Sequence, residues 1–352
     1  ALSAVLWRIA QLPIVFQVFI WISLLTVLFV GVAFILRRIV SRPLNSQTLV
    51  VAYVTAAVIS TFFVFLIILD AKELIRQRES ELLQNQIIPR RALTAEEKEK
   101  LPASLSSIGD LQWTTLLDTT GISVFQAQCT EPLIKFTLAQ VDLRMVEIKM
   151  DSSVAVKEKT SAFAKMHECI LAINGEAGTA PDMNAEFGQW MGNYVIDGKP
   201  IFLEDDKHRP FLAFNRQNHG TYSPEEIVDV ILDENKFNTI WGRYDCVVQG
   251  KTAVSPHDLS VMAKYPRTLM GIDSAGYALT LIIVDGRMPG HSVGMMMHQC
   301  AELMLSLGVF NGMACDQGGS SCFYLQNTGI INRPCEGGER PVYTHFGVKI
   351  RG

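Results

Sequence analysis

The chain has 352 residues, with 31 basic and 35 acidic side chains and a formal net charge of −4. This length leaves room for one domain of ordinary size with additional segments. The near-neutral charge excludes a strongly basic protein that binds nucleic acid through its phosphates, and no nucleic-acid partner is expected.

Two apolar segments near the start predict membrane helices. Val15–Leu36 contains no charged residue, and neither does Leu49–Leu69. Each reaches the roughly 20 apolar residues that a helix needs to cross a bilayer. A cleaved signal peptide would explain one such segment but not two. Residues 1–70 are therefore predicted to form a two-helix anchor whose partner is the lipid bilayer.

The short connection between these segments predicts their orientation. It carries Arg37, Arg38 and Arg42 and no acid, and positively charged loops stay in the cytoplasm. Both termini are then expected outside the cytoplasm, with the C-terminal domain facing the periplasm, a lumen or the exterior.

Residues 71–110 are predicted to join the anchor to a globular domain at 111–352. Asp70–Ile88 has the pattern of a charged helix, which Pro89 ends. The stretch that follows, to Asp110, is rich in charge, serine and alanine and is typical of a linker.

The domain alternates strand-like and helix-like segments. Strands are predicted at Ile134–Val141, Arg144–Met150, Cys169–Ile173 and Leu279–Val284, with a hairpin at Tyr194–Phe202 turning at Asp197-Gly198, and helices at Ser161–Glu168 and His298–Leu307. This pattern predicts a mixed α/β (α+β) domain.

Polar turns follow three of the apolar strands, at Asn174, Asp285 and Asp316. The last opens the run Asp-Gln-Gly-Gly-Ser-Ser321, and a second loop with two arginines and two carboxylates follows at 332–342. Glycines allow close backbone approach to a ligand, and arginine forks match phosphate or carboxylate oxygens. The alternative is a set of ordinary polar turns; the two loops together favour a ligand site.

The cysteines and methionines do not indicate a metal site. None of the seven cysteines forms a C-x-x-C pair, and Met295–Met297 lacks the regular Met/His spacing of a copper site. Cys322 and Cys335 either form a disulfide in an oxidising compartment or, like the other cysteines, are small hydrophobic residues. No metal or cofactor is predicted.

Six short motifs resemble, in order and approximate spacing, those of the phosphodiester glycosidase family. They are Val141–Leu143, Ala172–Gly175, Arg267–Ile272, Val284–Arg287, Cys315–Ser321 and Glu339–Val342. The resemblance runs from about residue 134 to the C-terminus. It implies a twisted, largely antiparallel sheet with flanking helices and a site at the strand ends. Two positions depart from the family pattern, since Gln317 and Glu176 stand where glycines are expected.

The resemblance also implies hydrolysis of a sugar 1-phosphodiester, with an N-acetylglucosamine-like sugar. Asp316 and Glu339 are the first candidates for the catalytic carboxylate, and Asp285 is the third. Arg267 and Arg340 are the first choices to hold the phosphate. The expected substrate-binding residues are Asn174, Arg267, Thr268, Arg287, Gly318, Gly319, Ser320, Ser321, Arg333 and Arg340.

Several of these residues also have structural interpretations. Asp285 and Arg287 can form a surface ion pair, Arg333 can brace its own loop, and His291 is typical of a solvated loop histidine. Two other functions stand beside the hydrolase. Gln317, Glu176 and the presence of two spans where an anchor needs only one suggest a non-catalytic subunit of a membrane complex, with further membrane partners. The third function is a carbohydrate-binding module.

Overall fold

The computed structural model describes residues 101–151, 157–176, 194–202, 209–224, 236–254 and 263–351. The predicted spans, Val15–Leu36 and Leu49–Leu69, and the predicted helix Asp70–Ile88 lie outside these ranges. Within them, no helix is both long enough and apolar enough to cross a membrane.

An eight-stranded antiparallel sheet forms the larger part of the domain. In spatial order its strands are β14 (Lys251–Thr252), β13 (Tyr244–Val248), β17 (Asn311–Ala314), β15 (Arg267–Ile272), β16 (Ala278–Val284), β5 (Leu133–Asp142), β4 (Ile122–Thr130) and β3 (Gln112–Thr119). The central strand β16 is apolar at nearly every position because both of its faces are buried.

A five-stranded antiparallel sheet packs against it. Its order is β19 (Gly329–Ile330), β18 (Phe323–Leu325), β7 (Leu171–Asn174), β20 (His345–Ile350) and β6 (Val146–Met150). A three-stranded sheet has the order β11 (Gly220–Ser223), β10 (Phe211–Phe214) and β12 (Asn238–Trp241). Two two-stranded sheets are formed by β8 (Tyr194–Ile196) with β9 (Lys199–Phe202) and by β1 (Ser104–Leu105) with β2 (Gly109–Asp110).

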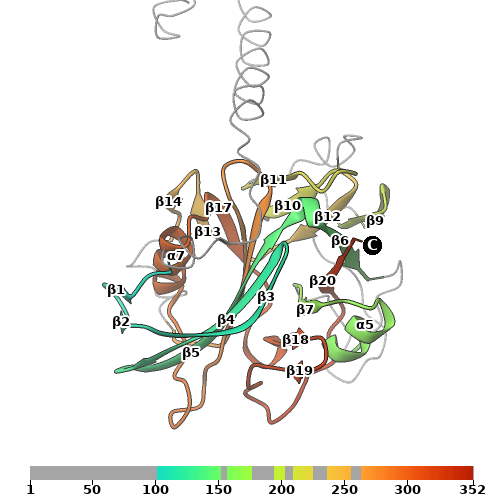
Figure 1. Cartoon of the computed structure of the whole chain (residues 1–352). Coiled ribbons are helices and arrows are strands. Elements are labelled where there is room, and N and C mark those ends of the chain that lie inside the picture. The colour runs from blue at the N-terminus through green and yellow to red at the C-terminus, as the bar shows by residue number, and fades with distance from the viewer. Residues whose placement is uncertain are drawn as a thin grey trace, which may run out of the picture. The chain divides into compact units, whose positions relative to one another are not determined.

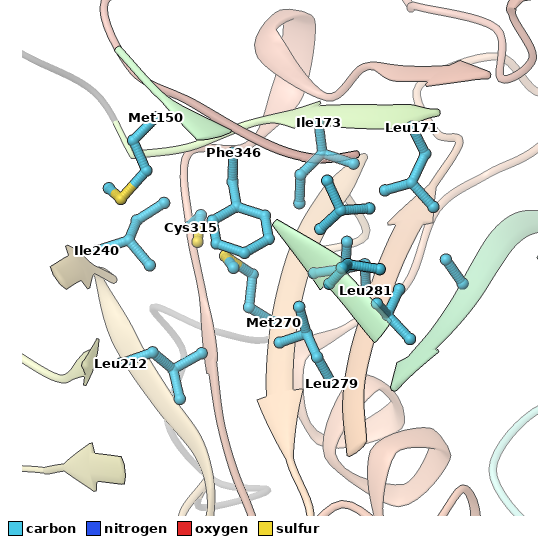
Figure 2. Close-up of a cluster of buried hydrophobic side chains, with 14 of the residues drawn as sticks. Met150, Leu171, Ile173, Leu212, Ile240, Met270, Leu279, Leu281, Cys315 and Phe346 are labelled. Atoms are coloured by element: carbon cyan, nitrogen blue, oxygen red, sulfur yellow. The ribbon is translucent and has the colours of Figure 1, made fainter. Parts of the chain in front are cut away.

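The main core lies between the two large sheets. Leu279 and Leu281 from one sheet meet Leu171, Ile173 and Phe346 from the other (Figure 2). Alternate residues of the same strands face outward, where each sheet is covered by a helix. The domain is thus four layers deep, with a helix on each outer face (Figure 1).

The two helices have different lengths but the same role. Helix α7 (Met297–Ser306) buries Cys300, Leu303 and Met304 against the eight-stranded sheet. Helix α5 (Thr160–Met166) packs Phe163 and Ala164 on the five-stranded sheet. Both lie close to their predicted positions, and so do β5, β7 and β16.

The antiparallel pairing is confirmed, but the single sheet that was expected is two packed sheets. The predicted strand Arg144–Met150 begins two residues late, since the Asp142 carboxylate caps a 3₁₀ turn at Leu143–Met145. The linker predicted to reach residue 110 also ends earlier, because β1 and β2 already belong to the domain and Leu105 and Ile108 are in its core.

The cysteines are all free thiols, and all but the half-buried Cys335 are buried. The possible Cys322–Cys335 disulfide is therefore absent. Burial raises the pKa of the Cys322 thiol to about 12, so this thiol behaves as a small apolar side chain.

Gly347 is predicted to be required for the packing of α5. A methyl group at this position of β20 would lie 2.6 Å from Cys169 Sγ and 3.0 Å from a ring carbon of Phe163. Gly347→Ala should lower the free energy of unfolding by about 1–3 kcal/mol, measured by urea denaturation. Gly290→Ala is the control, because nothing lies within 4 Å of that position. Equal stability of the two variants would contradict this packing.

Candidate functional site

The structure brings the three polar turns together at one end of the two sheets. Asn174 ends β7, Asp285 follows β16, and Asp316 follows β17. In the eight-stranded sheet, β15 lies between β16 and β17, with Arg267 opposite Val284 and Leu269 opposite Ala314. The backbone N–H of Asp316 donates to Gly175 O at 3.3 Å, which joins the two sheets at this end.

The side-chain amide of Asn174 fastens this junction. Its Nδ2 donates to Gly175 O at 3.0 Å and to Asp316 O at 3.1 Å. Its Oδ1 accepts from Thr268 Oγ1 at 2.8 Å and from the backbone N–H of Cys322 at 3.1 Å. Asn174 and Thr268 are fully buried, so their role here is to shape the turn that carries Asp316.

That turn, residues 315–322, is called the glycine turn below. Gly318 has a φ of +78°, and a Cβ there would lie 3.0 Å from Arg287 Nη1. A Cβ on Gly319 would overlap the carboxyl group of Glu336 and Nη2 of Arg340. Only glycines allow these two guanidinium groups to approach the backbone so closely.

The Asp316 carboxylate lies on this turn and is partly exposed. It accepts from the backbone N–H of Gln317 at 2.9 Å and from Ser320 Oγ. Arg340 Nη1 donates to the same hydroxyl at 3.3 Å. Ser320 therefore connects the Asp316 carboxylate to the Arg340 guanidinium. The neighbouring Ser321 Oγ is buried and lies 3.2 Å from Thr268 Oγ1.

A third cation, Arg243, reaches the turn from the start of β13. Its Nη2 lies 3.9 Å from Asp316 Oδ1 and 2.6 Å from Glu176 Oε1. The Glu176 side chain is fully buried. Burial opposes the charge of Arg243, but the ion pair with Glu176 outweighs it and raises the pKa of the guanidinium. Gly242 permits this approach, since a Cβ there would meet Met313.

Asp285 is buried and committed to a hydrogen-bond network. Its carboxylate lies 2.7 Å from His291 Nε2 and accepts from Asn332 Nδ2 at 3.1 Å and from the backbone N–H of Arg333 at 3.0 Å. It does not pair with Arg287, whose guanidinium lies over the ring of Tyr265, 4.6 Å from its centroid. Asp285 thus holds the loop at 332–342 in place, and the backbone N–H of Arg333 contributes one of these hydrogen bonds.

The side chains of two predicted site residues are occupied by partners other than Asp316. Both carboxylate oxygens of Glu339 accept from Ser161, at 2.8 Å and 2.7 Å. Arg267 is 2% exposed and donates to Met295 O, Ala263 O and the side-chain oxygen of Gln317. Gln317 therefore points at a buried arginine, whose pKa burial lowers.

Sequence reasoning missed Arg243, Glu336 and Asn332 as site residues and treated His291 as a solvated loop residue. Their roles depend on partners that are remote in sequence; Arg243, for example, is 67 residues from its partner Glu176. A glycine before Arg243 was the only local signal.

Two further observations delimit the site. No three His, Cys, Asp or Glu side chains gather as metal ligands in the described ranges. A depression of about 580 Å³ lies beside α5, lined by Lys165, Glu168, Tyr324, Asn327 and Lys349 among others. None of the glycine-turn residues lines it.

Asn174→Asp is predicted to loosen the glycine turn. The new carboxylate oxygen would face the carbonyl oxygens of Gly175 and Asp316 in a buried position, where an uncompensated charge costs about 3–5 kcal/mol. Chemical denaturation measures this loss. The control Asn327→Asp lies on an exposed turn and should change stability by less than about 0.5 kcal/mol. A similar small change in both variants would show that Asn174 does not fasten the turn.

Comparison with known structures supports this fold. The catalytic domain of zebrafish N-acetylglucosamine-1-phosphodiester α-N-acetylglucosaminidase, auto-inhibited by pro-peptide, superposes with a TM-score of 0.55 at 19% identity, covering 75% of this chain and 96% of that one. A hypothetical protein from Synechocystis gives a TM-score of 0.51 at 13% identity, covering 69% of this chain and 68% of the other. No curated protein matches the sequence.

A family model described as phosphodiester glycosidase matches residues 167–349, just over half of the chain. The matched region includes Asn174, Asp285, the glycine turn and all three arginines that approach it. The chain therefore belongs to the phosphodiester glycosidase family, a family of glycosidase-type hydrolases.

Proposed function

We propose that this enzyme hydrolyses the bond between the anomeric carbon of a sugar and the phosphate of a 1-phosphodiester. The observation that carries the proposal is the approach of Arg243, Arg287 and Arg340 to the turn that holds Asp316. Guanidinium groups beside a glycine backbone bind phosphate oxygens well. An N-acetylglucosamine-like sugar is the proposed donor, supported by the fold shared with the zebrafish domain.

The chemistry of this bond suits the residues present. The leaving group is a phosphate monoester, which is stable as an anion, so charge stabilisation matters more than proton donation. Arg287 and Arg340 would supply that charge at the glycine turn. Arg267, the other first choice, is buried and occupied by neutral oxygens.

Asp316 is the proposed catalytic carboxylate. An oxocarbenium-like transition state needs a carboxylate close to the anomeric carbon, as nucleophile or as base for water. Asp316 is partly exposed beside the arginines, whereas Asp285 is saturated by three donors and Glu339 is held by Ser161. Asp316 is favoured over the other two because it lies 3.9 Å from Arg243 and shares the Ser320 hydroxyl with Arg340.

Asp316→Asn should abolish turnover while keeping the fold. The test incubates the purified full chain with a methyl phosphodiester of N-acetylglucosamine 1-phosphate and measures released sugar. A loss of about 10³-fold or more in kcat is expected. Asp197→Asn is the control, because an Asn-Gly hairpin turn replaces an Asp-Gly one at an exposed site.

Other outcomes of this test lead to different functions. Equal activity of Asp316→Asn and the wild-type chain would remove Asp316 from the chemistry. Sugar-phosphate binding without release would favour a carbohydrate-binding module. Neither binding nor release, with co-purifying membrane proteins, would favour a non-catalytic subunit.

We also propose that the enzyme is tethered by Val15–Leu36 and Leu49–Leu69, with the catalytic domain outside the cytoplasm. The uncharged segments and the arginines between them support this arrangement. In sealed inside-out vesicles, protease should leave the catalytic domain intact until detergent is added. Digestion of the domain in intact vesicles would contradict the orientation, and extraction by alkaline carbonate would contradict the anchor.

A further inference from the structure

Among the three arginines at the glycine turn, Arg340 alone is paired with a partly exposed glutamate. Arg340 Nε donates to Glu336 Oε2 at 3.0 Å, and Nη2 donates to Oε1. This is the two-pronged geometry in which a guanidinium also binds two phosphate oxygens. These hydrogen bonds raise the pKa of Arg340.

The Glu336 carboxylate also lies against the turn itself. A Cβ built on Gly319 would overlap the Glu336 carboxyl group, so this anion occupies the space above the glycine backbone. Arg340 connects the same place to Ser320 Oγ, which binds Asp316. Arg340 is thus two hydrogen bonds away from the proposed catalytic carboxylate.

The pair is built so that it separates easily. The Glu336 and Arg340 side chains are 47% and 41% exposed, and an exposed ion pair stabilises a protein by only about 0–1 kcal/mol. Gly337 and Gly338 follow Glu336, and nothing lies within 4 Å of a Cβ at either position. By contrast, Glu176 holds Arg243 from a fully buried position and cannot leave as easily.

We propose that the Glu336 carboxylate occupies the place of the substrate's phosphate on Arg340 and is displaced when the phosphodiester binds. Glu336 is then a specificity-determining residue that competes with every anion for this subsite and sets the affinity of the enzyme for phosphate groups. The inference rests on the proposed function only for the identity of the displacing ligand.

Glu336→Gln tests the competition directly, with inorganic phosphate as the probe and the full chain in an isothermal titration. Removing the charge should tighten the phosphate Kd by about 2- to 5-fold. The KM for the methyl phosphodiester should fall by a similar factor, with kcat retained. Arg340→Ala should weaken phosphate binding, and adding Glu336→Gln to it should then change nothing further.

Glu168→Gln is the matched control. It removes the same charge from another exposed ion pair, with Lys349, beside the α5 depression. The phosphate Kd should stay at its wild-type value.

Three results would overturn the inference. They are an unchanged or weaker phosphate Kd in Glu336→Gln, a collapse of kcat that makes Glu336 an acid or base, and tightening that persists in Arg340→Ala. Phosphate binding is measured without turnover. Tighter phosphate binding without any hydrolysis would therefore uphold the competition and reject the proposed reaction.

Discussion

The site depends on the four hydrogen bonds of the buried Asn174 amide. Two carbonyl oxygens accept from its nitrogen, while Thr268 and the Cys322 backbone donate to its oxygen. One side chain thereby joins β7 of the smaller sheet to β15 of the larger one and to both ends of the glycine turn. A buried amide with every group satisfied specifies one arrangement, because each alternative leaves a donor or acceptor without a partner.

The acidic residues near the glycine turn fall into two groups according to their partners. Asp285 accepts from three donors, Glu339 accepts from the backbone and hydroxyl of Ser161, and Glu176 is buried against Arg243; these carboxylates hold loops in place. Asp316 and Glu336 remain partly exposed beside arginines. Asp316 and Glu336 differ in how firmly they are held, since hydrogen bonds within the turn fix Asp316 whereas Glu336 lies on a glycine-rich loop. Fixed carboxylates suit catalysis, and movable ones suit exchange with a ligand.

Much of the fold follows from local pattern in the sequence. The apolar run of β16, the periodicity of α7 and the Asp197-Gly198 turn predicted their elements because those signals are local. The division into two sheets was not predictable, since alternation along a strand does not say which sheet the strand joins. The turns at Asn174, Asp285 and Asp316 were found as strand ends. Which carboxylates are held by structural hydrogen bonds was not predictable, because those bonds join residues far apart in sequence. Glu339 and Ser161, for example, are 178 residues apart.

The most direct test is a crystal structure of the enzyme with bound N-acetylglucosamine 1-phosphate. We expect the phosphate to lie over Gly318 and Gly319, in contact with Arg287 and Arg340, and Glu336 to have turned away from Arg340. A phosphate bound instead in the depression between Lys165 and Lys349, with the Glu336–Arg340 pair intact, would contradict this expectation.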